Sequence, residues 1–169
     1  MEKRDLYDIN RNLTGQTIYK GDQIPDDNYI VVVLVFIQNT DGKFLIQKRS
    51  ARKNGLYATT GGHPKSGEDS VQGILTEVKE EIGLDIKTED LQLYYSGRSD
   101  ESHVFYDDYY IKMDVEDIAK LKLQEDEVES LHWFSTDEIH QLMEQGKFFK
   151  NHYEEFEELE KWGRTQKLK

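Results

Sequence analysis

The chain has 169 residues, a formal net charge of −12 and no cysteine. A chain of this length can bury one core, so we expect a single domain over 1–169, without disulfides, thiolate nucleophiles or thiolate metal sites. The acidic balance argues against binding to a nucleic-acid polymer, because a broad basic surface for phosphates is missing.

The N-terminal segment 1–5 is charged and lacks the apolar run of a signal peptide. The longest apolar run, 30–37, is far shorter than the roughly 20 residues that a membrane helix needs. We therefore expect a cytoplasmic protein without membrane contact. Since β-branched and apolar residues fill 30–37, this run predicts a strand near the centre of a sheet, covered on both faces.

Turn residues at 39–42 separate this strand from a second one at 43–49, and the pair predicts a β-hairpin. The end of the second strand begins the most basic segment of the chain. We expect its cations to bind substrate phosphates, although charges at the end of a hairpin are often only solvated. The candidates are Lys48, Arg49, Arg52 and Lys53.

A helix is predicted over 70–81, with Gly83 as its end. Glu77, Glu80 and Glu81 fall within an arc of about 100° on this helix, apart from its apolar face. Carboxylates at this spacing repel one another, and hard oxygen ligands beside a glycine-rich loop suit Mg²⁺ or Mn²⁺. The alternative is a solvated acidic face.

Strands are predicted over 91–96, 104–113 and 128–134. The sequence 135–138 has the form of a capping box that opens a helix to about residue 145, and 151–162 has the pattern of an amphipathic helix. Strands accompanied by helices predict an α/β layered fold. Aromatic side chains on the strands alternate, which favours core packing over stacking on a ligand.

The spacing around the predicted helix resembles the Nudix box, G-x5-E-x7-R-E-U-x-E-E-x-G-U, in which U is aliphatic. The matching residues are Gly62, Glu68, Glu77, Val78, Glu80, Glu81, Gly83 and Leu84. The arginine of the box is replaced by Thr76. In the family this arginine orients box carboxylates, and we expect a short hydroxyl to be unable to do so, which lowers turnover more than metal binding.

Segments outside the box are similar to the branch of Nudix proteins related to isopentenyl-diphosphate isomerases. They are 5–8, 14–15, 21, 24–25, 47–50 and 60–64. An ordinary hairpin with turns is the alternative explanation of the N-terminal ones. An isomerase is disfavoured, because that family's catalytic cysteine lies where this chain has Gly61.

The resemblance implies a Nudix fold, an α/β/α sandwich with a central mixed β-sheet. It also implies hydrolysis of a diphosphate linkage in a small molecule, with a nucleoside diphosphate derivative as the expected substrate and Mg²⁺ or Mn²⁺ as cofactor. A weakly active nucleotide-binding module is the alternative, motivated by Thr76. The oligomeric state stays open, with a homodimer among the possibilities.

Glu77 and Glu81 are the first expected metal ligands, because they lie one helical turn apart and point the same way. Glu80 is a third or outer ligand, and the carbonyl of Gly62 is a further candidate. The resemblance implies that Glu68 and Gly83 support the box. The expected catalytic residues are Glu77, Glu80, Glu81 and Glu127. Glu127 lies outside the box, where we expect it to be a metal ligand or a general base; the alternative is one more surface acid.

Overall fold

The computed structural model describes residues 2–167. Its strands are β1 (Lys3–Tyr7), β2 (Leu13–Tyr19), β3 (Ile30–Gln38), β4 (Phe44–Arg49), β5 (Tyr57–Ala58), β6 (Thr60–Gly62), β7 (Gln92–Ser99), β8 (Val104–Lys112) and β9 (Val128–Phe134). Its α-helices are α1 (Ser70–Ile82), α2 (Thr136–Glu144) and α3 (Lys150–Lys167), with short 3₁₀ turns at Thr88–Asp90 and Ile118–Lys120. None of the helices in 2–167 is both long and apolar enough to cross a membrane.

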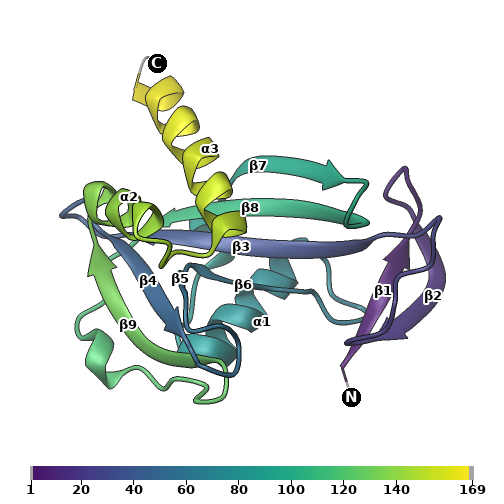
Figure 1. The fold of residues 1–169 in the computed structure, drawn as a ribbon. Coiled ribbons are helices and arrows are strands. Elements are labelled where there is room, and N and C mark those ends of the chain that lie inside the picture. Colours follow the sequence, from purple (N-terminus) through teal and green to yellow (C-terminus); the bar gives the residue numbers. More distant parts are fainter. Residues whose placement is uncertain (1, 168–169) are drawn as a thin grey trace.

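A mixed sheet forms the centre of the fold, and helices cover both of its faces (Figure 1). Its strand order is β5-β4-β3-β8-β7, with β6 beside β3 and β9 beside β4. The strand β3 runs parallel to β8 from Ile30 to Gln38 and antiparallel to β6 at Val33 to Val35. The predicted central position of this strand is confirmed, as is the α/β sandwich.

The prediction that β3 and β4 form a β-hairpin is wrong except for the residue pair next to the turn. The two strands pair only at Gln38 and Phe44. Farther along, β4 pairs with β9 and β5, while β3 pairs with β6. The turn at 39–42 fixes only the strand ends, and distant segments then supply the backbone hydrogen-bond partners of both strands. As a result β3 and β4 separate.

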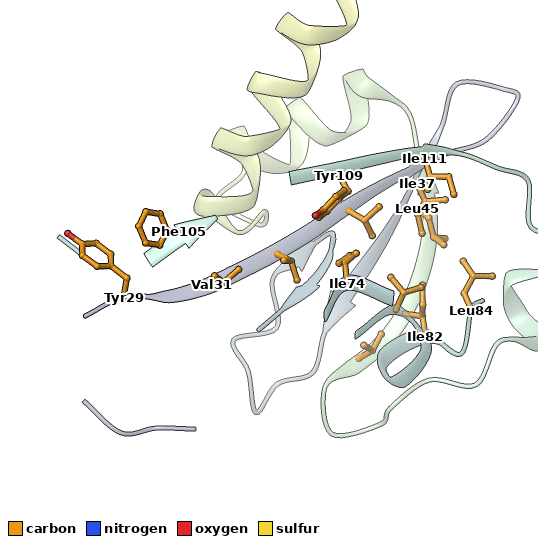
Figure 2. Packing of buried hydrophobic residues seen from close by; sticks show 14 residues of the cluster. Tyr29, Val31, Ile37, Leu45, Ile74, Ile82, Leu84, Phe105, Tyr109 and Ile111 are labelled. Atoms are coloured by element: carbon orange, nitrogen blue, oxygen red, sulfur yellow. The ribbon is translucent and has the colours of Figure 1, made fainter. Parts of the chain in front are cut away.

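Residues of β3 alternate between two apolar cores, as expected for a strand with covered faces. Val31, Val33, Val35 and Ile37 pack with α1, which contributes Ile74, Val78 and Ile82. Figure 2 shows side chains of this cluster gathered between the sheet and α1. Leu34 and Phe36 face the opposite way, toward α2 and α3, where they meet Phe44, Ile139, Phe156 and Leu159.

Both ends of α1 are fixed by their own residues. Asp69 caps the first turn and forms a capping box with Gln72. The helix ends at Gly83, whose φ of 70° is left-handed and favours glycine. A Cβ at this position would also lie 2.9 Å from the Lys122 carbonyl oxygen. The predicted helix and its glycine end are thus confirmed.

The remaining predicted elements also form. The capping box of α2 is present, with the Ser135 and Glu138 side chains each accepting from the other's backbone N–H. The helix α3 extends farther than 151–162 at both ends. The N-terminal strands β1 and β2 pair with each other as an antiparallel hairpin, separate from the main sheet (Figure 1).

Candidate active site

A cleft of about 670 Å³ opens beside the box, a volume typical of small-molecule sites. Its walls come from the box loop and α1, from the sheet strands β3, β4 and β8, from the N-terminal hairpin and from the start of α3. A separate hollow of about 580 Å³ beside Val128 contains none of the predicted metal ligands. The cleft is therefore the candidate active site.

Glu77 lies against the box loop. A Cβ on Gly62 would stand 2.4 Å from the Glu77 carboxyl carbon, so only glycine leaves this carboxylate room. Burial raises the pKa of Glu77 to about 7, although the ammonium of Lys65 and the backbone N–H of His63 oppose the shift. The structure therefore places Gly62 next to Glu77, and both are predicted metal ligands.

Glu81 is the most deeply buried carboxylate of the box, at 8% exposure. Burial, followed by repulsion from Glu77 and Glu127, raises its pKa to about 8. Within residues 2–167 its Oε2 atom has no hydrogen-bond partner. A buried, unpartnered carboxylate oxygen is costly unless a proton or a cation joins it.

Glu80 lies farther out. Its carboxylate binds the Lys65 ammonium at 2.6 Å and is about half exposed, so a side chain already compensates part of the acidic face. In the part of the chain that the structure describes, no three carboxylate or imidazole groups already converge on one point. A hard cation at Glu77 and Glu81 would complete its shell with backbone and water oxygens, as Mg²⁺ usually does.

Thr76 has a role that the sequence analysis did not foresee. Its hydroxyl donates to Glu68 Oε2 at 2.6 Å, while the backbone N–H of Lys65 donates to Glu68 Oε1 at 2.7 Å. The expectation that a hydroxyl cannot orient a box carboxylate is therefore wrong for Glu68. This carboxylate braces the loop against α1, so it has the supporting position that the resemblance implies.

The structure separates the predicted phosphate-binding residues. Arg49 lines the cleft, with its guanidinium 4.9 Å from the ring centre of Phe149. Lys48 instead binds Glu129 at 2.8 Å, outside the cleft lining. Arg52 is exposed in a turn and does not line the cleft either.

Lys53, which the sequence also singled out, and two further cations line the cleft. Lys53 binds the predicted catalytic residue Glu127 at 3.0 Å, and both side chains belong to the cleft wall. Arg4 on β1 and Lys20, in the turn that follows β2, line the same cleft. Sequence reasoning missed Arg4 and Lys20 because only the tertiary placement of the N-terminal hairpin brings them to the box loop.

The family model for the NUDIX domain matches residues 28–159. The chain belongs to the Nudix hydrolase family. Uncharacterised Nudix hydrolases of Listeria monocytogenes and Listeria innocua are each 33% identical to it over 153 residues, with 88% of both chains covered. As a Nudix hydrolase, the chain is an enzyme of the class that cleaves diphosphate linkages in nucleoside diphosphate derivatives.

Solved structures share its fold. A Deinococcus radiodurans protein superposes with a TM-score of 0.71 at 19% identity, covering 87% of this chain and 91% of its own. A bifunctional NMN adenylyltransferase/ADP ribose pyrophosphatase from Francisella tularensis, complexed with AMP and a manganese ion, gives a TM-score of 0.61 at 19% identity. The superposition covers 85% of this chain and 44% of the Francisella tularensis protein.

The cleft of this Nudix protein also contains a carboxyl pair outside the box. Asp108 on β8 is only 1% exposed, and Glu155 on α3 lies beside it. Burial, followed by the hydrogen bond and charge of Glu155, raises the pKa of Asp108 far above that of a free carboxyl group. Asp108 lies in a run of aromatic residues without any motif, so the sequence offers no signal for the pair.

Asp108→Asn should raise the melting temperature at pH 8 by about 5 °C or more, and by much less at pH 4. The folded state holds a proton on the carboxyl pair that the unfolded state releases above the normal pKa of Asp near 4, so the wild type loses stability as the pH rises from 4 toward the raised pKa of Asp108. Thermal unfolding followed by circular dichroism measures the difference. Asp26→Asn, at an exposed position, is the control for net charge. Destabilisation of Asp108→Asn at pH 8 would contradict the raised pKa.

Proposed function

We propose that this Nudix hydrolase uses Mg²⁺ or Mn²⁺ to hydrolyse the diphosphate linkage of a small nucleoside diphosphate derivative in the cleft. The observation that carries the proposal is the pair of Glu77, which is half-buried, and Glu81, which is buried; both carboxylates have raised pKa values and line the cleft. These carboxylates are shielded from water, and few positive charges of the protein lie near them. This arrangement favours binding of a divalent cation.

Glu77, Glu81 and the Gly62 carbonyl are the proposed ligands, with Glu80 as an outer partner that also holds Lys65. When bound, the cation would neutralise charge at the phosphate and lower the pKa of a water molecule. Glu127 is the proposed acceptor of the water's proton or a further ligand, and its ion pair with Lys53 holds it at the cleft wall.

Cations from two separate segments of the chain support an anionic substrate. Arg49 and Lys53 come from the end of β4 and the turn after it, and Arg4 and Lys20 come from the N-terminal hairpin. The Nε atom of Arg4 is buried without a hydrogen-bond partner in the described chain, so a phosphate oxygen would satisfy it. Arg4 and Lys20 take the place of Lys48 and Arg52 in our proposal.

An isomerase of isopentenyl diphosphate is not supported. A side chain at position 61 would place its Cβ 2.6 Å from the Val33 carbonyl oxygen, so the backbone here is built for glycine. A cysteine at this point would displace β3 from β6. A weakly active binding module remains the rival proposal.

Activity and metal binding test the proposal together. Purified protein with Mg²⁺ or Mn²⁺ should release phosphate or monophosphates from members of a panel of nucleoside diphosphates, ADP-ribose, dinucleoside polyphosphates and prenyl diphosphates. Titration should give Mn²⁺ binding that weakens at least tenfold in the Glu77→Gln/Glu81→Gln double variant. Equal affinity in both proteins would overturn the metal assignment, and nucleotide binding without turnover would favour the binding module.

A further inference from the structure

The pair formed by Asp108 and Glu155 lies in the cleft at a distance from the box. In the sheet, Leu34 pairs with Gly61 on one side and with Asp108 on the other. Because neighbouring strands are about 4.8 Å apart, the Asp108 backbone lies about 10 Å from the glycine loop that holds Glu77. This span corresponds to a sugar with its attached phosphate.

Placing two carboxyl groups side by side in the interior destabilises the fold unless a proton or a ligand compensates them. Asp108 is 1% exposed, and within residues 2–167 neither its Oδ2 atom nor the Oε2 atom of Glu155 receives a hydrogen bond from a donor. Two ionised carboxylates cannot donate to each other. One shared proton resolves this, and burial next to further acids holds the proton in place.

The charged groups around the pair strengthen this state. Glu154 and Glu158 on α3 and Asp107 on β8 raise the pKa of one or both members. Among these acids, Asp107 accepts a hydrogen bond of 2.9 Å from the Arg11 guanidinium. A pair with one proton offers a hydrogen-bond donor and carboxylate acceptors side by side.

The wall beside the pair is formed by three aliphatic side chains and a tyrosine. Its residues alternate along β3 and β8 and so share one face of the sheet. They are Val32, Leu34, Val104 and Tyr106. A flat heteroaromatic ring fits such a wall better than a sugar does, because a polyhydroxyl group would leave donors and acceptors unsatisfied there.

We propose that Asp108 and Glu155 bind the nucleobase of the substrate, through a base edge on which a donor and an acceptor stand side by side. The assignment rests on the proposed diphosphate hydrolysis and adds a specificity site to it. The carboxylate accepts from a base N–H, and the protonated carboxyl donates to a base carbonyl or ring nitrogen. The diphosphate then reaches the box carboxylates.

The test compares kcat/KM for a nucleoside diphosphate, ribose 5-diphosphate and methyl diphosphate in wild type, Asp108→Asn, Asp108→Leu and Glu155→Leu. The amide keeps a donor and an acceptor, whereas leucine keeps only the shape. We expect leucine at either position to lower the preference for the nucleoside diphosphate over ribose 5-diphosphate at least tenfold. Asparagine should keep it within threefold. Circular dichroism confirms folding, and Glu157→Gln, exposed on α3, is the matched control.

An equal loss on all three substrates in the leucine variants would overturn the proposal, because it would mark the pair as structural. A loss shared by the nucleoside and ribose compounds, but not by methyl diphosphate, would assign the pair to the sugar and overturn the nucleobase assignment. If the wild type hydrolyses neither these three compounds nor any other member of the panel, the proposed function fails. Calorimetric binding of nucleoside monophosphates then tests the pair separately: the leucine variants should lose it at least tenfold, and unchanged affinity would overturn the inference.

Discussion

Glu81→Gln is expected to lower kcat by a hundredfold or more while the protein stays folded. The substitution keeps the shape of the side chain and removes the charge that a cation at the transition state requires. Because burial raises the pKa of the Glu81 carboxyl to about 8, a neutral amide at this position should leave the melting temperature unchanged or higher. Steady-state kinetics with excess Mg²⁺, together with thermal unfolding, measure both effects.

Glu89→Gln is the matched control for Glu81→Gln, since Glu89 is exposed on a 3₁₀ turn outside the cleft. It makes the same chemical change and should leave kcat within twofold. Near-normal turnover of Glu81→Gln would mean that the box carboxylates are structural. The chemistry would then have to come from Glu127 or from another wall of the cleft.

Gly62→Ala is expected to lower kcat about a hundredfold and to weaken Mn²⁺ binding about tenfold. The new Cβ would stand 2.4 Å from the Glu77 carboxyl carbon and 2.7 Å from both of its oxygens. A glutamate side chain can swing away, so the fold should survive while the carboxylate loses its position. Kinetics and Mn²⁺ titration of the folded variant measure this displacement.

A double-mutant cycle isolates the effect of Gly62→Ala. If the alanine acts through Glu77, it should change kcat and metal affinity little in a Glu77→Gln background. Gly163→Ala is the matched control, because a Cβ at Gly163 meets nothing within 4 Å. Additive losses in the cycle would show that the alanine disturbs β6 and not the carboxylate.

Much of the fold followed from local patterns. The apolar run of β3, the carboxylate face and glycine end of α1, and the capping box of α2 each depend on residues within a few positions of one another. Side-chain periods of 2 and 3.6 make such features readable in one dimension. The box spacing is local in the same sense, and it identified the Nudix fold.

The pairing of the strands was not readable in this way. The turn at 39–42 predicted a full hairpin, yet β3 and β4 share one residue pair because β6 and β9 compete for their backbone groups. Strand pairing depends on partners that are far apart in sequence, and no local pattern ranks those partners.

The sequence by itself determined the family, the acidic face with Glu77 and Glu81, and the glycine that must stand beside them. The tertiary structure decided which charges meet that face: Lys65 at Glu80 and Lys53 at Glu127. It also gathered the cations of the N-terminal hairpin and the carboxyl pair of β8 and α3 in the cleft. The reason is physical, because spacing along the chain sets which side chains share a face, whereas burial and partners exist only once the elements pack.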